Sequence, residues 1–193
     1  MGKRGTFIAT LAAALLTSAA LALALPSPTP TPSGAQNGVY QVNYYSNAGS
    51  TTDPDGTVRI VNPSGSSLCA LIYVTDEDQE LRECCGCNVT DRGTRILSVD
   101  TDLTSNPANG VSTVNGSVAI VSSSATNCDA SLAKTSGNLA AYETHPQNDG
   151  TLTEDEFTPS PLSRPELNGL QTACAAIELV GSGKGICSCG TGG

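Results

Sequence analysis

The residues of this chain best suited to chemistry are its eight cysteines, three of which crowd into one short run. Cys84, Cys85 and Cys87 stand within four positions, and Cys187 and Cys189 repeat the Cys-x-Cys spacing later in the chain. Oxidised cysteines form disulfides, whereas reduced ones offer thiolates to soft ions such as Cu(I) or Zn(II). The redox compartment therefore decides between a stapled domain and a metal site.

Residues 1–24 have the pattern of a secretory signal, because Lys3 and Arg4 precede an apolar stretch. Cleavage after Ala24 and cleavage after Ala35 both fit. Residues 25–35 form a Pro/Thr/Ser linker that favours an extended conformation. An uncleaved membrane anchor is the alternative, since the stretch is also long enough to span a bilayer. Residues 36–193 then make a single secreted, extracellular or cell-surface domain.

Export favours disulfides, and the even number of cysteines, all after the signal, agrees with it. Cys84 and Cys85 would face opposite sides of a strand, so we expect them to bond to different, distant partners. For Cys174, the cysteines nearest in sequence are Cys187 and Cys189, and the connectivity stays open. We expect up to four disulfides from Cys69, Cys84, Cys85, Cys87, Cys128, Cys174, Cys187 and Cys189.

The net charge of the chain limits the classes of molecule that it can bind. Without Lys3 and Arg4, seven basic residues minus eighteen acidic residues gives a formal net charge of −11. Such a chain repels nucleic acid and anionic lipid, so we expect no nucleic-acid partner and membrane contact only through an uncleaved N-terminal segment. The expected partners are the protein itself, as a homo-oligomer or fibre, or other surface proteins. No cofactor is expected.

A hard-ion site is a weaker hypothesis. The twelve residues 145–156 match a calcium-binding EF-hand loop at Asp149, Gly150 and Glu156, but His145 and Gln147 stand where acidic ligands belong. We expect a polar hairpin turn instead, and we keep Asp149, Glu154 and Glu156 as weak metal candidates.

Enzymatic chemistry has little support. His145 is the one histidine, no nucleophile motif accompanies it, and we expect it on the surface before Pro146. The glycines of residues 181–185 suggest a phosphate loop but lack its spacing, so they predict a turn. We expect a protein that is not an enzyme.

Alternating and apolar runs predict an antiparallel β-sandwich of about seven or eight strands. The run 68–74 is almost continuously apolar and should be a central strand. Ser163 and Glu166 form a capping box that begins one C-terminal helix, ending at Gly181, with Cys174 on its inner face. A helical turn is possible over residues 78–84. The other expected strands cover residues 39–45, 57–61, 94–99, 117–122, 139–144, 151–157 and 185–189.

Four segments together resemble a group of secreted, uncharacterised, cysteine-rich bacterial proteins. They are the Leu-Cys-x-x-Ile-Tyr-Val run from Leu68, the Cys-Cys-x-Cys cluster from Cys84, the Asp-Leu-x-x-Asn-Pro run from Asp102, and the Gly-Ser-Gly run from Gly181 to Gly190. The resemblance implies export and a cysteine framework, and no activity.

These features favour a non-enzymatic structural or adhesive domain. One variant is a fibre in which the strand containing Val39, Tyr40, Val42 and Tyr44 adds to a neighbouring subunit. An ordinary strand within its own chain is the simpler alternative. A different class of function is an extracellular metal-binding module, through thiolates for copper or zinc or through acidic loops for calcium.

Overall fold

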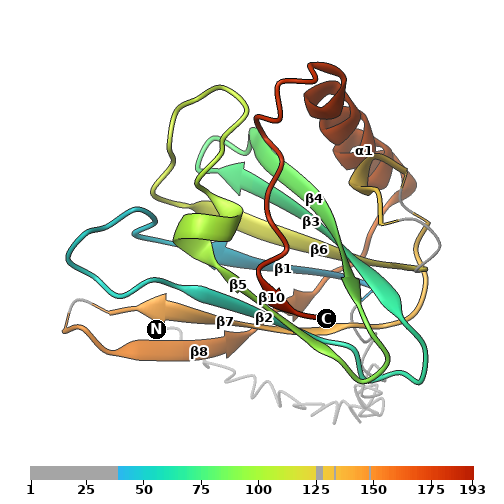
Figure 1. Ribbon diagram of the computed structural model, residues 1–193, viewed down its shortest axis with the longest axis horizontal. Helices are drawn as coiled ribbons and strands as arrows, with labels where there is room; N and C mark the ends of the chain where they lie inside the picture. Colours follow the sequence, from blue (N-terminus) through green and yellow to red (C-terminus); the bar gives the residue numbers. More distant parts are fainter. Residues whose placement is uncertain (1–38, 125–127, 133, 148) are drawn as a thin grey trace, which may run out of the picture. The chain divides into compact units, whose positions relative to one another are not determined.

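The computed structural model describes residues 39–193 apart from 125–127, 133 and 148. The described residues form ten strands in two five-stranded sheets, and every strand pair is antiparallel (Figure 1). The expected signal, anchor and linker lie outside the described residues. The predicted β-sandwich with one C-terminal helix is confirmed.

The first sheet has the order β4-β3-β6-β1-β9 and the second the order β10-β5-β2-β7-β8. Their strands are β1 (Tyr40–Tyr45), β2 (Thr57–Val61), β3 (Leu68–Asp76), β4 (Leu81–Val89), β5 (Thr94–Ser98), β6 (Gly116–Ser124), β7 (Ala140–Pro146), β8 (Leu152–Glu156), β9 (Thr158–Pro159) and β10 (Thr191–Gly192). Helix α1 covers Arg164–Leu179, and two short turns lie at η1 (Val99–Leu103) and η2 (Ala130–Leu132).

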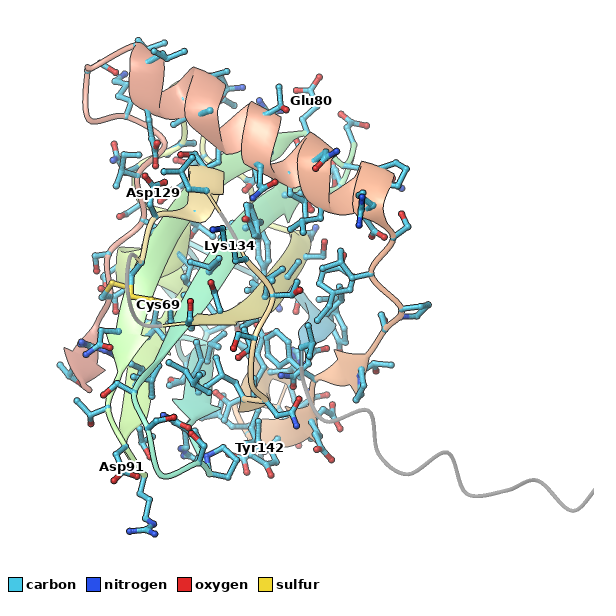
Figure 2. The ribbon with its side chains drawn as sticks, turned by 90° about the vertical axis from the view of Figure 1, so that its right-hand side faces the viewer. Cys69, Glu80, Asp91, Asp129, Lys134 and Tyr142 are labelled. Atoms are coloured by element: carbon cyan, nitrogen blue, oxygen red, sulfur yellow. A yellow bond between two sulfur atoms is a disulfide. The ribbon has the colours of Figure 1, made fainter. Side chains whose placement is uncertain are left out.

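At β3 the first sheet is buried on both faces, which explains the continuous apolar run in that strand. Its inner face packs on the second sheet through residues such as Ile72, Val118 and Ile120. Its outer face is covered by α1 and η2, against which Leu71 and Tyr73 pack. Figure 2 shows α1 lying across this outer face. Strand β3 lies between β4 and β6, so its predicted central position is confirmed.

Helix α1 begins where the capping box predicts. The Ser163 side chain accepts a hydrogen bond from the Glu166 backbone N–H, and Pro165 occupies the first turn. Of the helical residues, Cys174 is fully buried, while Leu167, Leu170 and Ile177 are half-buried against the sheet. The glycines after the helix have positive φ, so the predicted turn is confirmed.

The chain after this turn, residues 185–193, is called the C-terminal tail below. It passes the edge of β4 in the first sheet and then pairs with β5 in the second sheet as β10 (Figure 1). The tail therefore joins the two sheets along one open side of the sandwich.

Two local predictions were wrong. Residues 78–84 do not form a helical turn, because β4 begins at Leu81 and pairs with β3. Residues 185–189 do not form a ladder strand, because the tail makes only an isolated bridge between Ile186 and Cys84 before β10. In the first place the chain forms a hairpin with the preceding strand, and in the second the bonding partner is distant in sequence, so the pairing overrides the local pattern.

Strand β1 pairs within its own chain, with β6 along its whole length and with β9 at Gln41 and Val42. Its partners are not its neighbours in sequence. After Val42 the side of β1 that faces β9 has no strand partner, and there the Asn43 side chain accepts a hydrogen bond from the Tyr44 N–H.

Candidate functional site

Three of the four disulfides start from strand β4. Cys84 bonds to Cys174 of α1 on the outer face of the first sheet. Cys85 bonds to Cys187 and Cys87 bonds to Cys189 on the inner face. Successive residues of β4 alternate faces, so this short run ties the sheet both to the helix and to the C-terminal tail.

The remaining pair is Cys69–Cys128, whose position is labelled in Figure 2. All eight cysteines are bonded. Cys84 and Cys85 have different, distant partners, as their adjacency predicts. Cys174 bonds to Cys84 rather than to Cys187 or Cys189, the cysteines nearest to it in sequence, because the helix crosses the sheet and brings Cys174 to β4.

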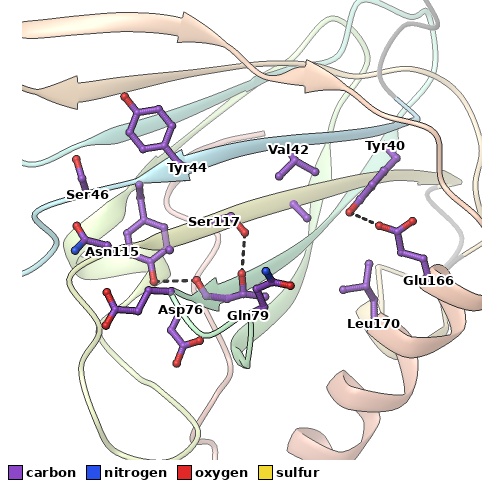
Figure 3. Close-up of a pocket in the computed structure, with 15 residues that line it drawn as sticks. Tyr40, Val42, Tyr44, Ser46, Asp76, Gln79, Asn115, Ser117, Glu166 and Leu170 are labelled. Carbon is purple, nitrogen blue, oxygen red and sulfur yellow. Dashed lines mark hydrogen bonds between the residues drawn. The ribbon is translucent and has the colours of Figure 1, made fainter.

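An open groove of about 720 Å³ lies on the outer face of the first sheet, beside the N-terminal half of α1 (Figure 3). Its floor is the outer face of β1 and β6, where Val42 and Ala119 lie. Glu166 and Leu170 of the helix close one end, and Asp76 and Gln79 stand at the other (Figure 3). Glu77, next to Asp76 in the chain, also lines the groove. Three tyrosines, Tyr40, Tyr44 and Tyr45, line it.

Hydrogen bonds hold two of these tyrosines. The Tyr40 hydroxyl donates to Glu166 Oε1 at 3.0 Å, which links β1 to α1. The Tyr45 hydroxyl donates to the Thr75 carbonyl at 3.1 Å and lies 2.7 Å from the Thr113 hydroxyl. Burial raises the pKa of both phenols, so they stay neutral donors. The groove therefore has a rigid floor.

The charge of the groove is negative. Asp76 is paired with Arg82. Burial acts to raise the pKa of this carboxyl, but the Glu80 backbone N–H and the Arg82 guanidinium hold it below its ordinary value. Glu77 and Glu166 have no such partner among the salt bridges of the described residues. Among the described residues, no lysine, arginine or histidine lines the groove. It could accept a cationic group together with apolar or polar contact to tyrosine rings.

A second polar cluster lies between the sheets, on strand β7. Glu143 and His145 both point inward and are each only 1% exposed. His145 stacks on Tyr44 with ring centroids 4.2 Å apart, and its Nε2 lies 3.4 Å from Asn43 Nδ2. Neither carboxyl oxygen of Glu143 has a hydrogen-bond partner among the described residues, and the same is true of His145 Nδ1. His145 was expected on the surface, and that prediction was wrong.

Burial shifts the pKa values of these groups. Desolvation raises the pKa of Glu143 to about 9 and lowers that of His145, against the opposing charge of Asp155. Both residues are therefore neutral near pH 7. Glu83, on the inner face of β4, also has a pKa raised to about 7 by burial, although the Asn106 N–H donates to its Oε1.

The weak metal candidates do not converge. Asp149 caps its own turn by accepting from the Thr151 N–H and hydroxyl, and Glu154 binds Arg59 at 2.8 Å. Glu154 and Glu156 lie on β8, which is wholly exposed. Strands β7 and β8 pair as a hairpin in which Pro146 lies opposite Leu152, so the predicted hairpin is confirmed. Among the described residues, no group of three metal-binding side chains is arranged to hold an ion.

The strand-exchange candidates lie on one element. Tyr40, Val42 and Tyr44 all line the groove from β1, and Val39 directly precedes that strand. Sequence reasoning missed the carboxylates Glu143 and Glu166 as site residues. The inward alternation of Leu139, Ala141 and Glu143 was visible, but the opposite face of the same strand is equally mixed, so the pattern did not say which face is buried.

No protein-family model matches the chain, and no curated protein or solved structure is similar to it at a significant level. In the part of the chain that the structure describes, no helix is both long and apolar enough to cross a membrane. Four disulfides fit an oxidising compartment. Function must be argued from the geometry.

Proposed function

We propose that this protein is a secreted or cell-surface, non-enzymatic structural domain whose copies join by exchanging strand β1. The disulfides support export. The absence of a free thiol and the burial of His145 support a role without nucleophilic catalysis. The exchange itself is carried by one observation, the position of β1 outside every disulfide loop.

The four disulfides close loops that all begin at or after Cys69. No disulfide therefore ties strand β1 to the sheet in which it lies. It is nevertheless inserted between β6 and β9 and buries Tyr40, Gln41 and Tyr45. A vacated slot would expose core, and only an equivalent strand restores the same contacts. Exchange between copies replaces each lost contact with an identical one.

A pair of cysteines across β1 and β6 tests the exchange. Val42 and Ala119 are register partners on the outer face. In the variant Val42→Cys/Ala119→Cys, exchange links two chains, whereas a monomer closes the bond within one chain. We expect covalent dimers and higher species on a non-reducing gel at high protein concentration, lost on reduction.

The matched control is Thr75→Cys/Ser117→Cys across β3 and β6. Both residues lie inside the loop closed by Cys69–Cys128, and their hydroxyls are 2.7 Å apart. This pair must close within one chain. Monomeric bands for both variants at high concentration would contradict the proposal, as would an unchanged particle size after deletion of residues 36–46.

Adhesion through the groove is a second candidate, favoured by its tyrosines and its unpaired carboxylates. Its partner would be a cationic segment of another surface protein. An immobilised oligolysine peptide is a suitable probe. We expect Glu77→Gln/Glu166→Gln to weaken binding several-fold, while Glu154→Gln/Glu156→Gln, which removes the same charge from exposed β8, changes it little. Equal losses would show a general charge effect instead.

A further inference from the structure

The inner face of β4 and the C-terminal tail bring four sulfur atoms into one cluster. Cys85 and Cys87 are two residues apart on the same face, and their partners are Cys187 and Cys189. The Sγ atoms of Cys85 and Cys87 are 4.0 Å apart, although no bond joins them. In a tetrahedral zinc site with Zn–S bonds of about 2.3 Å, neighbouring sulfurs are roughly 3.8 Å apart. The spacing between the two bridges already matches one edge of such a site.

The tail is held at β4 by contacts that do not depend on sulfur. The Cys84 N–H donates to the Gly185 carbonyl at 2.8 Å, and the Ser188 N–H donates to the Asp102 carbonyl at 2.9 Å. Beyond the cysteines, the Gly193 N–H donates to the Thr94 carbonyl at 3.0 Å, within the β10–β5 pairing. These bonds on both sides of Cys187 and Cys189 would keep the two thiols near β4 after reduction.

The cluster is open on one side and has a cation beside it. Cys189 and Gly190 are half-buried and Ser188 is exposed, whereas Cys87 is fully buried. A reductant can therefore approach from the tail. Arg95 Nη1 donates to the Cys189 carbonyl oxygen at 3.5 Å, which places a positive charge at the backbone of one of the four cysteines.

We propose that reduction of Cys85–Cys187 and Cys87–Cys189 opens a four-thiolate zinc site between β4 and the C-terminal tail. Each disulfide takes up two electrons from a reductant and two protons, and four thiols result; a thiol reductant leaves as its own disulfide, and a phosphine leaves as the phosphine oxide with water supplying the protons. One Zn²⁺ then displaces four protons and binds the four thiolates. A two-electron oxidant such as a small-molecule disulfide reverses the sequence by taking two electrons from each pair of thiolates, which reforms both protein disulfides and releases the ion.

This inference is independent of strand exchange, because β1 contributes no sulfur. It also gives the two Cys-x-Cys pairs a common role, because one disulfide is enough to fix the tail to β4, whereas a four-thiolate site needs both pairs. Cys84–Cys174 and Cys69–Cys128 lie on the opposite face of the first sheet and are outside the site.

The test uses the full exported domain, reduced with a phosphine under anaerobic conditions and then given Zn²⁺. Metal content after desalting, thiol count and far-UV circular dichroism are measured together, and Co²⁺ is used as a spectroscopic substitute for zinc. We expect one zinc per chain, a tetrahedral sulfur-type cobalt spectrum and slower reoxidation with zinc than without it.

Two variants separate this site from adventitious thiol binding. Cys87→Ser/Cys189→Ser should lose stoichiometric zinc and the cobalt spectrum, whereas Cys69→Ser/Cys128→Ser should keep both. Retention by Cys87→Ser/Cys189→Ser would overturn the proposal, and so would a reduced wild type that holds no metal. If reduction unfolds the domain, added zinc must restore the circular dichroism of the oxidised protein; failure to do so also counts against the site.

Discussion

Glu143 lies directly opposite Val58 in the β7–β2 ladder, so a carboxyl group shares the inner face of the sandwich with a fully buried valine. Neither carboxyl oxygen has a hydrogen-bond partner among the described residues. A buried group in this position must be neutral to be tolerated, and its protonation is thus coupled to folding.

The first prediction concerns pH. The pKa of Glu143 is raised by burial from 4.5 to about 9, so its contribution to stability is complete below pH 4.5 and is lost as pH rises toward 9. One proton changes the free energy of unfolding by about 1.4 kcal/mol per pH unit. We therefore expect the free energy of unfolding, measured in urea, to fall by about 2 kcal/mol between pH 7.5 and pH 9. Glu143→Gln should remove most of this slope.

Between pH 7.5 and pH 9, the pH dependence of stability does not come mainly from Glu83 or His145. Glu83 has a pKa of about 7, so its own loss of stability is largely complete by then. The pKa of His145 is lowered from 6.5, so its contribution is present above pH 6.5 and lost as pH falls. Exposed Glu154→Gln is the control and should leave the slope unchanged. An equal slope in Glu143→Gln would refute the assignment.

A second prediction concerns the bridge between β4 and α1. Cys84→Ala/Cys174→Ala opens a loop with a sequence separation of 90, and the chain-entropy argument gives a loss of about 4 kcal/mol. Because the bridge holds α1 to the sheet, the helical amides should exchange with solvent faster. Cys69→Ala/Cys128→Ala should cost a similar free energy without selectively exposing α1, as measured by hydrogen exchange with mass spectrometry.

A third prediction uses two glycines. A Cβ at Gly86 would lie 1.8 Å from the Cys128 carbonyl oxygen, so Gly86→Ala must displace backbone next to a disulfide. We expect a loss of about 3 kcal/mol in denaturant unfolding. A Cβ at Gly169, within α1, meets nothing within 4 Å. Gly169→Ala should therefore stabilise the domain by about 0.5–1 kcal/mol. The opposite order would contradict the packing described for β4.

A fourth prediction concerns the hydroxyl that joins β1 to α1. Tyr40→Phe removes the donor to Glu166 and should cost about 1 kcal/mol. Tyr44→Phe, at a side chain that is 54% exposed, should change thermal stability by less than about 0.5 kcal/mol. The same hydrogen bond should oppose the release of β1. When Tyr40→Phe is added to Val42→Cys/Ala119→Cys, covalent dimers should therefore appear at a lower protein concentration than in the variant with the two cysteines alone.

Much of the architecture follows from local chemistry. Alternation placed most strands to within two residues, the Ser163 cap and the Gly181 turn bounded α1, and the adjacency of Cys84 and Cys85 required separate partners. Each of these features depends on residues close in the chain, where spacing and conformation are directly linked.

The tertiary structure alone decided the rest. Strand β4 begins with polar residues, and it forms because β3 supplies backbone hydrogen-bond partners along its length. Strands β9 and β10 are two-residue pairings that depend on partners distant in sequence. The burial of Glu143 and His145 depends on which face of β7 meets the other sheet. The groove exists because α1 covers only part of the first sheet. Cysteine types and spacing determined that the chain would be stapled, whereas the crossing of helix and tail over β4 decided which sulfurs meet, because a disulfide forms only between atoms that the fold brings into reach.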